Sequence, residues 1–325
     1  MADDVLEVDI WEGDWELPSV DSDCLTVLAF SKFCGVPCRA VKRNNPVWTP
    51  SGTLPVLRAD GKSVSKMSEM LEIIKKRSPT GVTPQVGPNN ADVKAFSSLM
   101  EQKLLPAVLH TWWLDDQTYV DVTRPWYAHA SPFPLNFYIP GRLHRTAASI
   151  VYMAENVDPD NITKAEIEAK IYKDAKECLN HLSYRLGEQD FFFGSLPSEL
   201  DAKVIGYLAP LLKAPVQTNR LINHLKACTN LCTLCNRVLM RYFPLSPEEM
   251  ELKRKRDEET RQKMQIDSLE FPNKKRNILF AALFAAVAML SYALSSGIVK
   301  FGTENVNNPD YADDDYNDDD DDDNG

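Results

Sequence analysis

Residues 54–65 read LPVLRADGKSVS and contain two short strand-like segments on either side of a turn. Leu54–Arg58 has the composition of a buried strand, and Lys62–Ser65 that of a second strand. Asp60 and Gly61 lie between them and favour a tight reversal of the chain, because this pair suits hairpin turns. The segment therefore predicts a pair of antiparallel strands.

The segments on both sides of this hairpin extend it into a small domain. Leu6–Ile10 alternates apolar and acidic residues, as a half-buried strand does. Asp21–Phe33 has apolar residues on one helical face, with Asp21 or Ser22 available as the cap, and Cys38–Lys42 reads as another short strand. A helix follows the hairpin and is lined by Met67, Met70, Leu71 and Ile74. The order βαβ then ββα over residues 1–77 predicts a mixed sheet with helices on its faces.

A stretch rich in proline and glycine, residues 78–89, separates this domain from a region without strand patterns, residues 90–243. From Asn90 the apolar residues keep helical spacing as far as Pro106, which should kink or end that helix. The aromatic segment Trp112–Tyr138 follows and has no clear assignment. Residues 78–89 are therefore predicted to be an interdomain linker.

The rest of this region predicts further helices, so the fold class is α+β with an all-helical second domain. Thr163 and Glu166 form a capping box, and Gly187 ends the apolar stripe that follows it. Another helix is expected after Pro197, and a third over roughly Arg220–Tyr242. The apolar side of this third helix consists of Leu221, Leu225, Cys228, Cys232, Cys235 and Leu239.

Ile278–Val299 runs for 22 residues without a charged side chain. As a helix it is about 33 Å long, enough to cross a hydrocarbon core of about 30 Å. A buried core helix is the alternative, but such helices are usually shorter and carry a polar stripe. We predict a C-terminal transmembrane helix, preceded by a charged linker over residues 244–277. Three basic residues, Lys274–Arg276, precede this segment, and only Lys300 follows it. Because basic residues favour the cytosolic side of a membrane, we expect the N-terminal body in the cytosol.

The net charge of −11 belongs to the end of the chain. Residues 301–325 carry ten aspartates and Glu304, and the other acidic residues equal the 36 Lys and Arg in number. We expect residues 300–325 to form an acidic disordered tail in the intermembrane space. Met1–Ile10 has no secretory or transit pattern. The anchor is moderately hydrophobic and has basic residues on both sides, which favours the mitochondrial outer membrane. The chain has seven cysteines and no secretory signal, which indicates reduced thiols.

Several motifs resemble known families. Leu54-Pro55 before a strand, with Phe193-Gly194 and Ser198-x-x-Asp201 in a helical region, is similar to the glutathione transferase fold. In that family the proline is cis and shapes the thiol-ligand site, and the Ser and Asp cap a buried helix. These roles fall on Pro55, Ser198 and Asp201. The resemblance implies a thioredoxin-like domain over residues 1–77 and a transferase-like helical domain over residues 90–243.

The tail-anchored type of the metaxin family is a closer resemblance, over roughly residues 5–243 and the anchor. It is carried by Pro50-Ser51-Gly52-Thr53-Leu54-Pro55, Lys103-Leu104-Leu105-Pro106, Pro132-Phe133-Pro134-Leu135-Asn136-Phe137 and Phe191-Phe192-Phe193-Gly194. That family works in protein import and in the sorting and assembly of β-barrel proteins of the mitochondrial outer membrane. The resemblance implies a second metaxin paralogue without an anchor and the membrane-embedded barrel-assembly protein as partners.

A transferase active site is not evident. Trp11–Pro18 occupies the place where a transferase carries its Tyr, Ser or Cys, and its acidic residues would raise the pKa of a thiol. Ser19, Ser22 and Cys24 are possible substitutes, although Asp21 and Asp23 oppose a Cys24 thiolate. The Gln-Ser pair that holds the glutamyl group falls on Lys66 and Met67, and a thioether cannot donate a hydrogen bond. We therefore expect no catalytic residue.

No cofactor or metal site is predicted either. Cys228, Cys232 and Cys235 have the spacing of an iron-sulfur motif, but they fall within an apolar helical stripe, where thiols more often pack. The five histidines have no ligand spacing. The body is charge-neutral, which does not indicate a nucleic-acid partner.

The sequence thus favours a non-enzymatic docking subunit of the outer-membrane import and sorting machinery. Trp126 and Phe133 are the candidate partner contacts, because aromatic residues dominate binding energy. A membrane-anchored glutathione-dependent transferase is the alternative of another class, and an adaptor between mitochondria and transport motors is a third. Outer-membrane lipid is expected around Ile278–Val299.

Overall fold

The computed structural model describes residues 5–79, 90–154, 164–216 and 219–248, together with scattered positions between 250 and 292. Met1–Glu251 forms one compact unit and Leu252–Gly325 another. Both regions expected to be separate domains before residue 243 therefore lie within a single compact unit.

Within the described residues the sheet has four strands in the order β2-β1-β3-β4. Strand β1 (Leu6–Ile10) pairs in parallel with β2 (Cys38–Lys42), and Val8 lies opposite Ala40. On its other side β1 pairs antiparallel with β3 (Val56–Ala59), which in turn pairs with β4 (Lys62–Val64). The hairpin predicted from residues 54–65 is confirmed. Its first strand begins at Val56 rather than Leu54.

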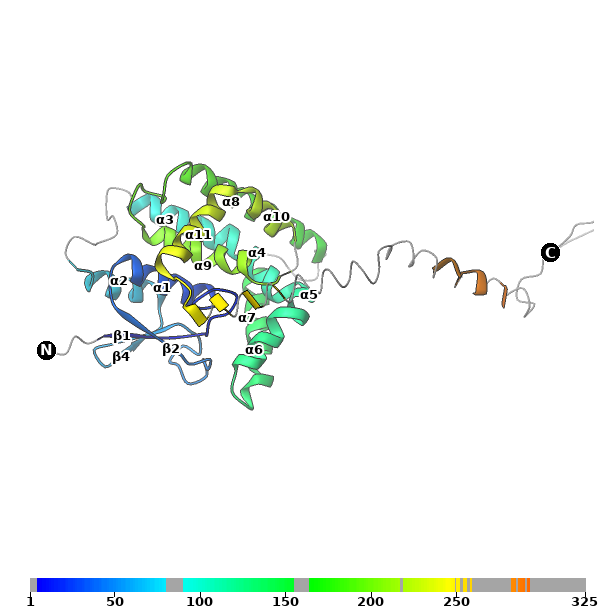
Figure 1. Ribbon diagram of the computed structural model, residues 1–325, viewed down its shortest axis with the longest axis horizontal. Helices are drawn as coiled ribbons and strands as arrows, with labels where there is room; N and C mark the ends of the chain where they lie inside the picture. The colour runs from blue at the N-terminus through cyan, green and yellow to red at the C-terminus, as the bar shows by residue number, and fades with distance from the viewer. Residues whose placement is uncertain are drawn as a thin grey trace, which may run out of the picture. The chain divides into compact units, whose positions relative to one another are not determined.

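Helices α1 (Ser22–Phe33) and α2 (Met67–Lys76) cover one face of the sheet, and the helical region lies beyond them (Figure 1). The Asp21 carboxylate caps α1 by accepting a bond from the Cys24 amide at 2.9 Å. Asp60 and Gly61 both have positive φ angles, as expected for the turn between β3 and β4. The mixed sheet is as predicted, but α1 and α2 both lie on one face of it rather than on its two faces.

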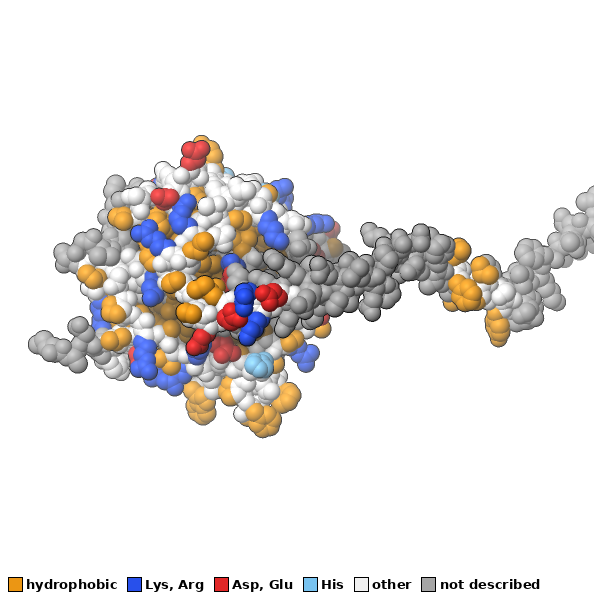
Figure 2. All heavy atoms as spheres, viewed as in Figure 1, with side chains coloured by type: hydrophobic (Ala, Val, Ile, Leu, Met, Phe, Trp, Pro, Cys, Tyr) orange, Lys and Arg blue, Asp and Glu red, His pale blue; other side chains and the backbone are white. Residues whose placement is uncertain are grey.

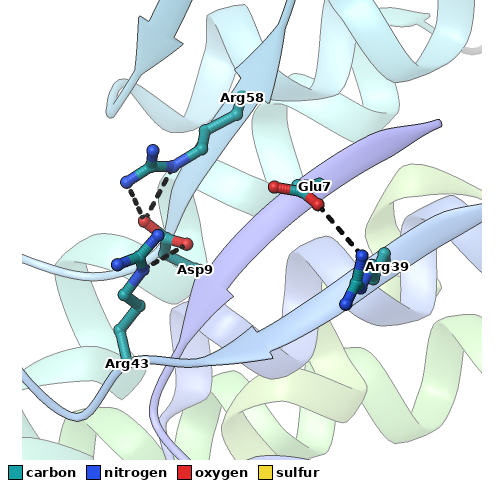
Figure 3. Close-up of polar contacts among 5 residues, drawn as sticks. All are labelled: Glu7, Asp9, Arg39, Arg43 and Arg58. Atoms are coloured by element: carbon teal, nitrogen blue, oxygen red, sulfur yellow. Dashed lines mark hydrogen bonds and ion pairs between the residues drawn. The ribbon is translucent and has the colours of Figure 1, made fainter. Parts of the chain in front are cut away.

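Asp9 departs from the alternation of buried apolar and exposed acidic residues that the sequence predicts for the first strand. Its side chain is only 1% exposed, although the pattern predicts an acidic residue facing solvent. Arg43 Nε donates to Asp9 Oδ1 at 3.1 Å, and Arg58 donates to Oδ2 from Nε at 3.0 Å and from Nη2 at 2.7 Å (Figure 3). The cluster joins β1 to β3 and to the end of β2, because the three side chains come from these segments.

Asp9→Ala is expected to lower the free energy of unfolding by about 2 kcal/mol, since it removes charge-assisted hydrogen bonds of about 1.5–3 kcal/mol. Both arginines are about half exposed and can be hydrated in the variant, which limits the cost. Urea denaturation followed by tryptophan fluorescence measures the change. Glu7→Ala is the matched control, because the Glu7–Arg39 pair is longer, 3.5 Å, and more exposed. Equal effects of the two variants would contradict a structural role for Asp9.

The second region consists of helices, some with π-helical turns between them. Their bounds are α3 (Asn90–Leu99), η1 (Met100–Leu104), α4 (Leu105–Leu109), η2 (His110–Leu114), α5 (Asp116–Thr118), η3 (Tyr119–Thr123), α6 (Arg124–Ala130), η4 (Leu135–Phe137), α7 (Ile139–Ala154), α8 (Lys164–Leu186), α9 (Glu199–Lys213), α10 (Arg220–Ala227) and α11 (Thr229–Tyr242). The unassigned aromatic segment is thus largely helical.

Pro106 does not end the helix in which it lies. The π-helical turn η1 comes directly before it, and the Leu105 amide bonds back to the Met100 carbonyl. Proline has no N–H to donate, and a π-helical turn changes the hydrogen-bond register at the place where the α-helical ladder would be broken. The helical path continues into α4 and η2.

The prediction of one continuous helix over Arg220–Tyr242 is wrong, because the structure has two helices there. The structure divides it at Cys228, whose backbone (φ −81°, ψ 73°) is not helical. The buried face of α11 then consists of Leu231, Leu234, Cys235, Val238 and Leu239.

Helix α1 packs directly against α9, which connects the sheet-bearing part to the helical part. Gly206 lies at this contact, buried in α9. A Cβ atom at this position would lie 2.0 Å from Thr26 Oγ1 and 2.6 Å from the Ser22 carbonyl oxygen. The absence of a side chain at Gly206 therefore sets how closely the two helices approach.

Most of the predicted anchor, including Ile278 and Val299, lies outside the described residues, as do Thr163 and the tail after residue 300. The described positions 282–284, 286–289 and 291–292 are helical. In the part of the chain that the structure describes, no helix combines the length and apolar character needed to cross a bilayer.

Candidate functional site

The peptide bond between Leu54 and Pro55 is cis and borders a cleft of about 270 Å³. One wall comes from the sheet-bearing part and includes Trp11, Pro55 and Met67. The opposite wall comes from α6 and α7 and includes Tyr127 and Leu143. The cleft therefore lies between the two regions of the compact unit, beside the proline that the transferase resemblance assigns to a thiol-ligand site.

Two of the three residues considered as substitutes for a catalytic group, Ser19 and Cys24, are buried, and the third, Ser22, is half-buried at the start of α1. Ser19 is fully buried, and its hydroxyl oxygen accepts a long bond of 3.4 Å from the Asp21 amide. The Cys24 side chain is also fully buried, and burial, reinforced by the charge of Asp21, raises the pKa of its thiol well above the ordinary value. At neutral pH Cys24 is therefore a protonated packing residue rather than a nucleophile.

The loop after β1 places an indole where a transferase carries its hydroxyl or thiol. Trp11 is 2% exposed and packs edge-on against Tyr127, with ring centroids 4.9 Å apart. Lys66 precedes α2, makes no side-chain cap bond and pairs with Glu69 at 3.6 Å. Met67 lines the cleft with an apolar thioether. Among the described residues, the cleft thus contains no activated thiol and no close match to a glutamyl-binding pair.

A cluster of aromatic rings lies next to this cleft. Trp15 stacks on Trp112 at 6.1 Å and lies 6.0 Å from Trp126, and Trp126 packs edge-on against Tyr127 at 4.9 Å. The Trp126 indole N–H donates to Asp14 Oδ2 at 3.2 Å. The cluster fixes the loop after β1 against α6, 112 residues away in sequence.

A second cleft, of about 440 Å³, opens on the outer side of this cluster. Its lining combines two tryptophan rings, Trp15 and Trp126, with acidic side chains. The carboxylates come from Glu12, Asp14 and Asp121. This surface suits a partner group that carries positive charge and can lie against an aromatic ring.

The structure separates the two candidate partner contacts. Trp126 lines the second cleft and is partly buried against the core. Phe133 lies beyond the end of α6, is 81% exposed and contacts Phe137 at 6.3 Å between ring centroids. Sequence reasoning missed Trp48, which is 86% exposed, and did not single out Phe137 and Tyr138 within the aromatic segment that contains Phe133. The lack of charged residues next to each of these aromatic side chains in the sequence is the signal that could have identified them.

Ser198 and Asp201 lie apart from both clefts, at the start of α9. Asp201 is fully buried and accepts bonds from the Ser198 amide at 2.8 Å, the Ser198 hydroxyl at 2.6 Å and the Phe192 amide at 3.1 Å. The pair forms a capping box. Their role is to hold the first turn of α9 against the Phe191–Gly194 turn.

The cysteine triplet does not form a ligand set. Cys235 is fully buried, Cys228 lies between α10 and α11, and the Cys232 thiol donates to the Leu225 carbonyl at 3.3 Å. Across the described residues, no group of three or more His, Cys, Asp or Glu side chains is placed to hold a metal ion.

Comparison with known proteins agrees with this architecture. Residues 24–144 match a family described as "Outer mitochondrial membrane transport complex protein", and residues 175–238 match "Glutathione S-transferase, C-terminal domain". Mouse Metaxin-1 is 40% identical over 295 residues, which cover 90% of this chain and 91% of the mouse protein. The chain belongs to the metaxin family.

Other metaxins and a transferase structure are also similar. Metaxin-3 of Xenopus laevis is 43% identical over 239 residues, covering 74% of this metaxin and 77% of the frog protein. A glutathione S-transferase of Ceriporiopsis subvermispora, solved in complex with glutathione, aligns with a TM-score of 0.49 and 16% identity over 75% of this chain and 99% of its own. This metaxin has a glutathione transferase-like fold, with a thioredoxin-like sheet followed by a helical domain.

Proposed function

We propose that this metaxin is a non-catalytic docking subunit of the machinery that imports proteins at the mitochondrial outer membrane and sorts and assembles β-barrel proteins there. The observation that carries the proposal is the 40% identity with mouse Metaxin-1 over 90% of the chain. The match to an outer mitochondrial membrane transport complex protein supports the same compartment and process. Burial of Cys24 supports a role without thiol chemistry.

The proposed topology has three parts. Ile278–Val299 anchors the chain in the outer membrane, the body faces the cytosol, and residues 300–325 lie in the intermembrane space. The uncharged length of the anchor and the basic residues Lys274–Arg276 before it support this orientation. A body held in this way meets its partners at the membrane surface.

The proposed partners are a second metaxin paralogue without an anchor and the barrel-assembly protein of the outer membrane. The partner contact is placed at Trp126, because this ring combines a hydrogen bond to Asp14 with a position in the acidic cleft. Phe133 does not line that cleft. A basic or aromatic side chain of the partner can lie against the Trp15 and Trp126 rings that line the cleft.

Trp126→Ala is expected to lower co-purification of the second metaxin from mitochondria about tenfold, a loss typical of a central aromatic contact. The melting temperature is measured alongside, because Trp126 also packs against the core. Tyr184→Ala is the matched control, since this tyrosine on α8 is 91% exposed and lies outside the aromatic cluster. Unchanged recovery with Trp126→Ala would remove this contact from the proposal.

A membrane-anchored glutathione-dependent transferase is the second candidate, and the cleft beside the cis Leu54–Pro55 bond favours it. We expect glutathione to bind with a Kd of about 1 mM or weaker, since Met67 cannot hydrogen-bond the glutamyl group. Calorimetry on the purified protein measures this affinity, and a conjugation assay measures turnover. Micromolar binding with turnover would favour the enzyme.

A further inference from the structure

Two loops of the compact unit contain no side chain that is charged at neutral pH. Residues 44–53, NNPVWTPSGT, join β2 to β3, and residues 131–141, SPFPLNFYIPG, lead from α6 into the first residues of α7. Neither segment contains Asp, Glu, Lys, Arg or His. We refer to residues 44–53 and 131–141 as the two uncharged loops. Surface loops without charge are unusual in a chain in which 26% of residues are charged.

These loops expose large aromatic side chains rather than burying them. The exposed fractions are 86% for Trp48, 81% for Phe133, 79% for Phe137 and 53% for Tyr138. With about 150–250 Å² per aromatic side chain, they present on the order of 500 Å² to solvent. The summed ring area is comparable with the largest contiguous apolar patch of a typical soluble monomer, about 300–600 Å², and such patches are often functional.

The two loops lie at the same edge of the compact unit. Arg142, directly after the second loop, donates a hydrogen bond from Nη2 to the Gly52 carbonyl oxygen of the first. The 270 Å³ cleft is lined by Pro46 and Thr53 on one side and by the first turns of α7 on the other. Both loops reach the lower edge of the view in Figure 1, where hydrophobic side chains gather in Figure 2.

The surroundings of the loops favour a lipid surface over a protein. Trp, Tyr and Phe together are the side chains that populate the interface of a bilayer, where a ring can be buried next to polar headgroups. An exposed basic residue lies next to each loop, Lys42 before the first and Arg145 after the second. Such residues suit anionic headgroups, and the lack of charge between them allows the rings to enter the interface.

The proposed anchor would keep the body within a limited distance of the membrane. The compact unit ends at Glu251 and the apolar segment begins at Ile278, so 26 residues separate them. Even fully extended, this segment spans at most about 90 Å. An anchored body therefore stays close to the bilayer, where an aromatic edge of moderate area is sufficient for contact.

We propose that the two uncharged loops insert their aromatic rings into the cytosolic interface of the outer membrane. The loops give the body a second contact with lipid, which orients it on the surface. The inference rests on the proposed anchoring of the chain. It leaves the acidic cleft at Trp126 free for a protein partner.

The test places a photoreactive side chain in the full-length protein. Trp48→benzoylphenylalanine and Phe133→benzoylphenylalanine are made separately, with Tyr184→benzoylphenylalanine as the control at an equally exposed aromatic position. Each protein is reconstituted into vesicles of phosphatidylcholine, phosphatidylethanolamine and phosphatidylinositol, with no other polypeptide present. After illumination, mass spectrometry measures lipid adducts. We expect both loop positions to give about fivefold or more of the adduct formed at the control position, because rings in the interface contact acyl chains.

A second pair of variants tests whether the two loops act together. Phe133→Asp, combined with the photoreactive group at position 48, is expected to lower the adduct at position 48, because a carboxylate disfavours insertion of the shared edge. Tyr184→Asp in the same background should leave that adduct unchanged. An equal loss from both aspartate variants would overturn the proposal.

Alkaline carbonate extraction of the same vesicles separates this inference from the anchoring proposal. A carbonate-resistant protein with loop adducts no higher than the control overturns only the lipid contact. An extractable protein with high loop adducts supports the lipid contact and overturns the anchor. A protein that fails to float with the vesicles overturns both. In isolated outer membranes, adducts to protein without adducts to lipid would overturn the lipid contact and indicate that the loops bind a protein partner.

Discussion

Asp201→Ala is expected to lower the free energy of unfolding by about 3–5 kcal/mol, because it leaves buried donors without an acceptor. The amides of Phe192 and Ser198 both donate to this carboxylate, and neither group is exposed. Each unpaired buried N–H costs about 1–3 kcal/mol, and the loss of the capping box adds about 1 kcal/mol. Thermal denaturation should show a decrease in Tm of about 10 °C for a unit of this size.

Glu199→Ala provides the matched control for this experiment. Glu199 lies in the same first turn of α9 and has the same charge, so it has a similar interaction with the helix dipole. It does not belong to the capping box, and its removal should cost less than about 1 kcal/mol. If Asp201→Ala and Glu199→Ala lower Tm equally, the dipole rather than the buried hydrogen bonds explains the effect.

Ser198→Ala tests the other half of the capping box. It removes the hydroxyl that donates to Asp201 at 2.6 Å but keeps the carboxylate and both amides that bond to it. The expected loss is about 1 kcal/mol, a typical value for an N-cap serine. The asymmetry between the two variants follows from the buried donors, because the Asp201 carboxylate accepts from two amides at 2.8 and 3.1 Å, whereas Ser198 Oγ accepts only a long bond of 3.4 Å from the Asp201 amide.

The N-terminal part of the fold could be predicted from sequence because its signals are local. The hairpin depends on the Asp60-Gly61 turn between two short segments. Helix α1 depends on the Asp21 cap, which is followed by a run of apolar residues. Each signal spans only a few residues, and the structure contains the corresponding element. The metaxin motifs, which the comparisons confirm, likewise needed only contiguous residues.

Features that depend on contacts between distant residues were not predictable in this way. Asp9 looks like a solvent-facing acidic residue, and only the fold shows that Arg43 and Arg58, 34 and 49 residues away, cover it. The break at Cys228 is similar, because the apolar spacing continues through it without glycine or proline. Both helices that meet at Cys228, α10 and α11, pack on α8 and α9.

The candidate site contains one feature that agrees with its sequence-based prediction and one that differs from it. Met67, at a position where the transferase pattern fails, lines the same cleft as Pro55, so the structure brings these two positions together. Trp126 and Phe133 were predicted as one aromatic contact surface from their proximity in sequence. The structure gives them different surroundings, since α6 turns Trp126 towards Asp14 and leaves Phe133 exposed beyond its end.

Gly206→Ala is expected to lower the free energy of unfolding by about 3 kcal/mol, at the upper end of the usual cost of overpacking. The added methyl would lie 2.0 Å from Thr26 Oγ1 and 2.6 Å from the Ser22 carbonyl oxygen. Thr26 cannot easily turn away, because its hydroxyl is bonded to that carbonyl at 2.8 Å, and the carbonyl belongs to the backbone of α1. Relief therefore requires α1 and α9 to move apart, which opens buried contacts along their length.

Gly141→Ala is the matched control, because Gly141 also lies in a helix and a Cβ there would have no atom within 4 Å. It should stabilise the protein by about 0.5 kcal/mol through the helix propensity of alanine. Urea denaturation followed by tryptophan fluorescence compares the two variants. Thr26→Ala combined with Gly206→Ala should recover part of the loss, since it removes one of the two atoms that the methyl meets. If Gly206→Ala behaved like Gly141→Ala, the close approach of α1 and α9 could not be what joins the sheet-bearing part to the helices.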